Sequence, residues 1–68
     1  MVLYRFLFLD QREIVVGTRD REHGSDAAAL NEAATYLGRF SSVNIWCDRR
    51  MVGRVVQPAV PPRARPRL

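Results

Sequence analysis

The first nine residues, Met1–Leu9, form an almost continuous apolar run that offers no polar face to water. Successive side chains of a β-strand point to opposite sides of the sheet. One side of this strand would carry Tyr4, Phe6 and Phe8, and the other would carry Leu3, Leu7 and Leu9. A strand with one wet face alternates apolar and polar residues instead. We therefore expect both faces of this strand to be covered, partly by another molecule.

A chain of this length gains stability from contacts with another molecule. A domain of about 60 residues buries only roughly 60% of its unfolded surface, so small folds often need a disulfide, a metal or oligomerisation. The chain has 68 residues, and Cys47 is its only cysteine, so an internal disulfide is impossible. Cys47 and the single histidine, His23, provide too few ligands for an ordinary zinc site. We expect no metal and no cofactor, and a homodimer or a complex with a protein partner.

The N-terminal run does not have the pattern of a membrane or secretion signal. It is much shorter than the roughly 18 apolar residues of a membrane span. Arg5 interrupts it, Asp10 follows it directly, and no small-residue cleavage site comes after it. A single unpaired thiol suits a reducing compartment, so the predicted location is cytoplasmic.

The net charge of +4 is unevenly distributed along the chain. Residues 1–56 carry eight arginines against seven acidic residues, whereas residues 57–68 carry three arginines and no acid. The basic character therefore belongs to the C-terminal segment. Because this segment also holds four prolines, we expect a folded domain over 1–56 and a disordered tail over 57–68.

Hydrophobic patterning predicts four strands, over 2–9, 14–22, 43–47 and 51–56. A helix is predicted between the two pairs of strands, from about Asp26 to Leu37, because alanine, leucine and glutamate dominate there. Ser25 or Asp26 would cap its N-terminus, and Gly38 follows its end. Its predicted apolar stripe consists of Leu30, Ala33, Ala34 and Leu37.

The polar break between the first two strands predicts a hairpin. Placing Asp10 opposite Glu13 sets Arg5 opposite Thr18. A one-residue slip would set Arg5 opposite Arg19, and directly opposed like charges are unfavourable. The register of the second hairpin stays open, because two-residue and three-residue loops both give acceptable pairs.

The element order β-β-α-β-β indicates an α+β fold: a four-stranded antiparallel sheet with one helix on one face. One helix leaves the second face uncovered. We expect Tyr4, Phe6, Phe8 and Trp46 on that face, as a protein interface, because so much aromatic surface is unusual in water.

Six short segments of residues 2–55 carry a resemblance. They are Tyr4-Arg5-Phe6, Leu9-Asp10, Ile14-Val15, Ser25 to Leu30, Val43-Asn44-Ile45-Trp46 and Val52-Gly53-Arg54-Val55. Together they resemble small uncharacterised bacterial proteins, a domain of unknown function with an aromatic-rich N-terminal hairpin, one helix and a Val-x-Val-Trp C-terminal hairpin. Such proteins often have glycine in both turns, where this chain has charged residues. The resemblance implies the fold, but it implies no activity and no functional residue.

No combination of residues in the sequence predicts catalysis. Asp10 and Glu13 are expected at a solvated turn, and His23 in an exposed polar loop without an oriented partner. Cys47 is expected to be a small buried residue of the third strand. The sequence therefore favours a non-enzymatic protein.

The leading functional hypothesis is a small interaction module that associates with itself or with a protein partner through the uncovered face. The alternative is weak nucleic-acid binding, in which Arg63, Arg65 and Arg67 contact phosphates and Trp46 stacks on a base. Docking of the proline-rich tail into an aromatic groove is a third possibility, although no P-x-x-P motif with flanking specificity is present.

Overall fold

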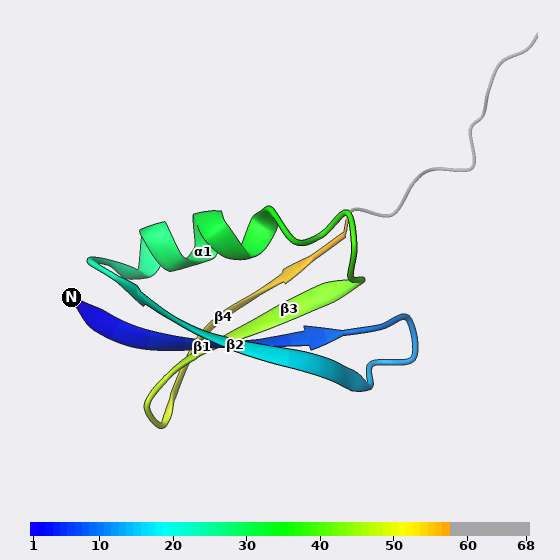
Figure 1. The fold of residues 1–68 in the computed structure, drawn as a ribbon, viewed down its shortest axis with the longest axis horizontal. Coiled ribbons are helices and arrows are strands. Elements are labelled where there is room, and N and C mark those ends of the chain that lie inside the picture. Colours follow the sequence, from blue (N-terminus) through cyan, green and yellow to red (C-terminus); the bar gives the residue numbers. More distant parts are fainter. Residues whose placement is uncertain (58–68) are drawn as a thin grey trace, which may run out of the picture.

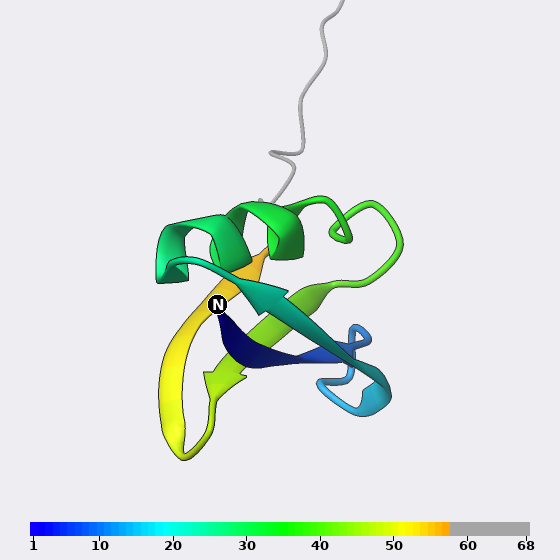
Figure 2. The same ribbon diagram turned by 60° about the vertical axis from the view of Figure 1, so that its left-hand side comes forward.

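Four strands and one helix, in the order β-β-α-β-β, make up the computed structural model, which describes residues 1–57. The elements are β1 (Val2–Leu9), β2 (Val15–His23), α1 (Asp26–Ala34), β3 (Ser42–Cys47) and β4 (Arg50–Val56). The strands form one antiparallel sheet in the order β2-β1-β3-β4. Figures 1 and 2 show α1 lying across one face of this sheet. The predicted α+β fold is confirmed, whereas the predicted disorder of the tail concerns residues that, after Gln57, lie outside the described range.

The helix begins where the sequence predicts but ends earlier. Ser25 is the N-cap, with extended backbone, and its hydroxyl accepts a hydrogen bond from the Ala28 amide at 3.1 Å. The helix ends at Ala34 rather than Leu37. Beyond it the backbone bonds run from residue i to residue i−3, and the Thr35 hydroxyl donates to a carbonyl of the last turn. This tighter turn stops the α-helix one turn early.

The aromatic residues of β1 lie beneath the helix and form the core. Tyr4, Phe6 and Phe8 are only 2%, 0% and 6% exposed. Ala29 and Ala33 of α1 are fully buried against this core, and Leu30 and Leu37 of the predicted stripe pack against it, whereas Ala34 is exposed. The small side chains of Ala29 and Ala33 allow α1 to lie close to the sheet. The expectation that the three aromatic residues occupy the uncovered face is therefore wrong.

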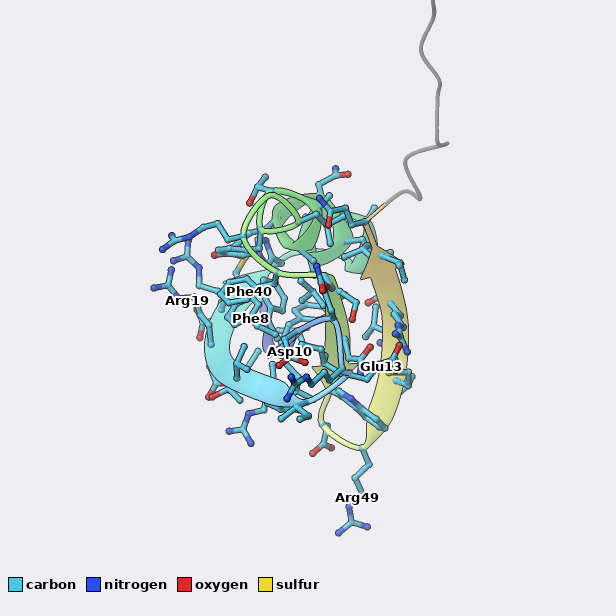
Figure 3. All side chains as sticks on the ribbon, turned by 90° about the vertical axis from the view of Figure 1, so that its right-hand side faces the viewer. Phe8, Asp10, Glu13, Arg19, Phe40 and Arg49 are labelled. Atoms are coloured by element: carbon cyan, nitrogen blue, oxygen red, sulfur yellow. The ribbon has the colours of Figure 1, made fainter. Side chains whose placement is uncertain are left out.

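Two further rings explain why this side of β1 is the covered one. Tyr36 and Phe40 come from the connection between α1 and β3, and both pack on Phe8 with ring centroids 4.9 and 4.7 Å apart. Figure 3 shows Phe8 and Phe40 side by side. Burying one large apolar side chain stabilises a fold by about 1.5–3 kcal/mol, so the largest rings gather where α1 and the connection exclude water.

The register of the first hairpin differs from the predicted one by two residues. Arg5 lies opposite Asp20 rather than Thr18. Val16 is the extra residue of a β-bulge in β2, a feature that the residue pattern did not reveal. The observed register replaces a neutral partner of Arg5 with an oppositely charged one, which is the better cross-strand pair.

The β1–β2 loop is built around Asp10. Its carboxylate accepts hydrogen bonds from the backbone amides of Arg12 and Ile14, at 2.8 and 3.0 Å. Glu13 has a φ of 63°, in the left-handed region that non-glycine residues seldom adopt. The capped loop sets Leu9 opposite Val15 rather than Ile14, which shifts the register by one residue, and the bulge at Val16 adds the second.

One side of β1 is buried and the other is exposed, so substitutions on the two sides should lower the free energy of unfolding by different amounts. Phe6→Ala should lower the free energy of unfolding by about 3–5 kcal/mol, because it leaves a cavity in the core. Leu3→Ala, on the other face, should lower it by less than about 1 kcal/mol, since Leu3 is 54% exposed. Urea unfolding of both variants measures the difference. Equal costs would contradict the assignment of the two faces.

Candidate functional site

The sheet surface opposite α1 is its least covered part, and we call it the open face. Residues directly opposite one another in an antiparallel sheet share a face, so the register defines its members. These are Leu3, Arg5, Leu7, Thr18, Asp20, Glu22, Asn44, Trp46, Met51 and Arg54. Most of them are exposed, and Leu7, Asn44 and Trp46 are half-buried. No other segment of residues 1–57 forms a second layer over this surface.

One end of the open face is closed by the β1–β2 loop. The Glu13 carboxylate of this loop accepts a hydrogen bond from the Arg54 guanidinium of β4 at 2.8 Å, and Figure 3 shows Glu13 beside that strand. Leu9 and Ser42 belong to the same side of the sheet, but they are only 5% and 2% exposed. Any binding surface therefore lies toward the other end, near the β3–β4 turn.

A hollow of about 480 Å³ lies at that other end. Its lining residues are Leu3, Arg5, Leu7, Asp20, Trp46 and Asp48. Three of them are apolar and the other three are charged. The volume lies within the roughly 300–1,000 Å³ of typical small-molecule pockets. The hollow can therefore accept one or two side chains of another segment.

Arg5 and Asp20 form a two-point ion pair across β1 and β2. The Arg5 Nε and Nη2 atoms donate to the two carboxylate oxygens of Asp20 at 2.9 and 3.2 Å. The hydrogen bond from Arg5 lowers the pKa of Asp20, and partial burial opposes it. Both side chains remain well exposed, so the pair contributes little stability. Its main effect is to hold two charged groups in fixed positions at the hollow.

The open face carries more negative than positive charge. Its two ion pairs, one in the hollow and one at the β1–β2 loop, are neutral, whereas Glu22 and Asp48 make no ion pair within residues 1–57. Arg49, the neighbour of Asp48 in the β3–β4 turn, points away from the body of the molecule (Figure 3). Residues 1–57 together carry eight arginines and seven acidic residues. The open face is thus the acidic side of a slightly basic domain.

A second polar cluster lies on the helix side, around Glu32. The two oxygens of Glu32 lie 2.6 Å from His23 Nε2 and 2.6 Å from the Tyr36 hydroxyl, which donates to it. Arg21 Nε is 3.4 Å from the same carboxylate. Burial raises the pKa of Glu32, but the hydrogen bonds from Tyr36 and His23 and the charge of Arg21 lower it more, so the pKa is below normal.

His23 is therefore not the exposed loop residue that the sequence suggested. It is the last residue of β2, half-buried, and its ring stacks on Phe6 at a centroid distance of 6.2 Å. The cluster ties the end of β2 to α1, and both Glu32 oxygens are occupied by residues of the fold itself. These groups act as structural contacts.

Asp26 forms a similar link at the start of the helix. The Tyr4 hydroxyl donates to Asp26 Oδ1 at 2.6 Å, and Arg50 donates to both oxygens at 3.1 and 3.2 Å. Hydrogen bonds from Arg50 and then from Tyr4 lower the pKa of Asp26. The bond to Asp26 and burial raise the pKa of Tyr4. The first turn of α1 is thereby connected to β1 and β4.

The structure separates the four residues predicted as a protein interface. Trp46 lies on the open face, whereas Tyr4, Phe6 and Phe8 lie in the core on the opposite side of the sheet. Arg63, Arg65 and Arg67, the alternative nucleic-acid contacts, lie outside the described residues. Cys47 is half-buried against the core, and no group of three or more potential metal ligands occurs within residues 1–57.

Sequence reasoning missed the residues that accompany Trp46. The sequence pattern places Leu3 and Leu7 on a separate side of β1, but the interface was predicted on the other side, which carries the larger rings. The sequence places the acidic residue Asp48 only in the connection between the predicted strands 43–47 and 51–56. Its place at the hollow depends on a left-handed backbone, with φ 59°, which the sequence does not reveal.

Comparison with known proteins gives no relative from which a function could be transferred. No family model matches the chain, and no curated protein or solved structure matches it either. The resemblance to small bacterial proteins stays a prediction. In the part of the chain that the structure describes, no helix has the length and apolar character needed to span a membrane.

The lowered pKa values predict a loss of stability in acid. Asp20, Asp26 and Glu32 bind protons more weakly in the folded than in the unfolded chain, where their pKa is about 4. Their contribution is therefore complete above that value and disappears as the pH falls through the lowered values. We expect the free energy of unfolding, measured by urea titration, to decrease as the pH falls from about 5 toward 3.

The same measurement tests the Glu32 cluster. Glu32→Gln should lower stability near neutral pH and make its decline toward acid shallower, because one of the responsible carboxylates is gone. Glu22→Gln is the matched control, since Glu22 makes no ion pair within residues 1–57. A Glu32→Gln profile parallel to that of the unmodified protein would show that this carboxylate is not linked to folding.

Proposed function

We propose that this protein is a small, non-enzymatic interaction module that binds a protein partner or a second copy of itself through the open face. The observation that carries this proposal is the hollow at Trp46, which combines apolar walls with fixed charges. A tryptophan beside leucines, rimmed by charged groups, is typical of the anchoring region of protein interfaces.

Exposure of apolar side chains on the open face supports the proposal. Leu3 and Met51 are 54% and 41% exposed, and Leu7 and Trp46 are half-buried beside them. Leu3, Leu7 and Trp46 line one hollow, and apolar side chains gathered in this way more often mark an interaction surface than scattered single residues do. Since the only cysteine cannot form an internal disulfide, binding would also stabilise a domain of this size.

The position of the polar residues supports a non-enzymatic role. His23, Glu32 and Tyr36 bond to one another on the helix side, away from the open face. The carboxylate of Asp20 is engaged by Arg5. A binding function needs none of these groups to act as an acid, base or nucleophile. A reducing, cytoplasmic setting forms part of the proposal, because Cys47 is the only cysteine.

Sedimentation equilibrium at micromolar concentration tests self-association. The unmodified chain should give an average mass above 7.8 kDa that rises with concentration. Leu3→Asn should shift the equilibrium toward monomer, because it removes an apolar contact without adding charge. Val2→Asn is the control: Val2 is 46% exposed on the same strand but lies opposite His23, on the other side of the sheet.

A monomer at every concentration would leave only a different protein as partner. Capture experiments with the unmodified chain, Leu3→Asn and Val2→Asn as baits then test whether a different protein binds the open face. Loss of a captured protein with Leu3→Asn alone supports the open face as its binding site. Equal behaviour of all three proteins in both experiments would contradict the proposal.

Nucleic-acid binding is the alternative, and it depends on Arg63, Arg65 and Arg67, which the described structure does not include. The acidic open face gives it no support, because phosphates would be repelled there. Titration of the full chain with single-stranded and duplex DNA and RNA at two salt concentrations tests it. Binding that weakens with salt and disappears when the three arginines become glutamine would favour this alternative.

A further inference from the structure

We infer that the chain's own C-terminal segment, residues 58–68, is a ligand of the open face and occupies the hollow at Trp46. This inference rests on the proposed function, because it takes the open face as a binding surface. It adds the identity of one occupant and a form of regulation, since a segment that fills the hollow competes with any other partner.

Charge complementarity is the first argument. The C-terminal segment carries three arginines and no acidic residue. Asp48 and Asp20 line the hollow, and Glu22 lies beside Leu3 on the neighbouring strand. Asp48 and Glu22 make no ion pair within residues 1–57, so both carboxylates are available to a cationic ligand. The C-terminal segment and the open face therefore carry opposite net charges.

The reach of the segment is the second argument. Gln57, the last described residue, is fixed beside the start of β3 by a hydrogen bond from its amide to the Ser41 carbonyl at 2.9 Å. The hollow lies near the other end of β4, a strand of seven residues and hence about 23 Å long. A proline-rich segment extends by about 3.1 Å per residue. Arg65, eight residues beyond Gln57, is then up to about 25 Å away from it, which matches this distance.

The third argument is that the side chains of the C-terminal segment suit those of the hollow. Proline and arginine side chains both pack well on the face of an indole ring, and carboxylates beside the ring bind the guanidinium. Trp46 provides the ring and Asp48 a carboxylate in the same hollow. The segment contains Pro62-Arg63 and Arg65-Pro66, in which the two residue types adjoin.

Occupancy of the hollow by the tethered segment should reduce the binding of other partners to the open face. A tether of this length raises the effective concentration of the segment at the hollow to the millimolar range. Weak contacts then suffice to keep the hollow partly filled. Because arginine–carboxylate contacts at a surface are screened by salt, a rise in ionic strength should free the hollow.

Trp46 is the only tryptophan of the chain, so its fluorescence reports on the hollow directly. The experiment compares acrylamide quenching of the full-length protein with that of a variant in which Arg63, Arg65 and Arg67 are all replaced by glutamine. We expect steeper quenching in the variant at low salt. We also expect the unmodified protein to approach the variant at high salt, and the single indole N–H resonance to shift in parallel.

A charge-matched control separates docking from a change in net charge. Arg12, Arg19 and Arg39 are exposed, make no ion pair within residues 1–57 and do not line the hollow, so their joint replacement by glutamine removes the same charge away from the hollow. This control should quench like the unmodified protein. Equal changes in both triple variants would overturn the inference.

Three further results complete the test. Asp48→Asn, which asparagine's tolerance of left-handed backbone should allow to fold, is expected to abolish most of the effect of the C-terminal replacements. Quenching that depends on protein concentration would show that the segment of a second copy fills the hollow, which overturns docking within one chain. If no variant changes the quenching while Leu3→Asn still weakens association, the inference fails and the proposed function stands.

Discussion

The structure depends on the burial of three aromatic side chains of β1 beneath one short helix. Tyr4, Phe6 and Phe8 share one side of the strand, and α1 with its following connection is the layer that covers them within residues 1–57. Small residues, Ala29 and Ala33, bring the helix close enough to exclude water from these rings. Once the rings occupy the covered side, the leucine side of the same strand has to remain on the open face. The candidate binding surface is thus a direct consequence of how the core is filled.

Polar contacts at both ends of the helix hold this arrangement in place. Glu32 connects α1 to the end of β2, and Asp26 connects its first turn to β1 and β4. The residues most suited to acid–base chemistry are therefore engaged in positioning the helix. These contacts lie on the helix side of the sheet. The open face takes no part in them and carries apolar side chains and carboxylates instead.

Much of the fold could be predicted from the sequence, because local patterns determine it. The strands, the helix, its Ser25 cap and the two-sided character of β1 follow from periodicity and capping. The side of β1 that faces the helix could not be predicted, since alternation defines two sets of residues without ranking them. Two rings decide the matter: Phe40 lies in a connection that has no periodic signal, and Tyr36 lies within the predicted helix but outside its predicted apolar stripe. The hairpin register was missed because the left-handed backbone of the β1–β2 loop and the bulge in β2 are not visible in residue spacing.

The distribution of charge also limits which partners suit the open face. Glu22 and Asp48 make no ion pair within residues 1–57, and two open faces brought together without any other group would place these carboxylates of both copies in one interface. Like charges that lose water repel more strongly, so such a dimer would be disfavoured unless cations lay between the copies. Arginines of residues 58–68 supply three positive charges per chain, which exceeds the two unpaired carboxylates of the face. A cationic segment is therefore a better occupant than a bare second face, and any association of two copies should involve these arginines.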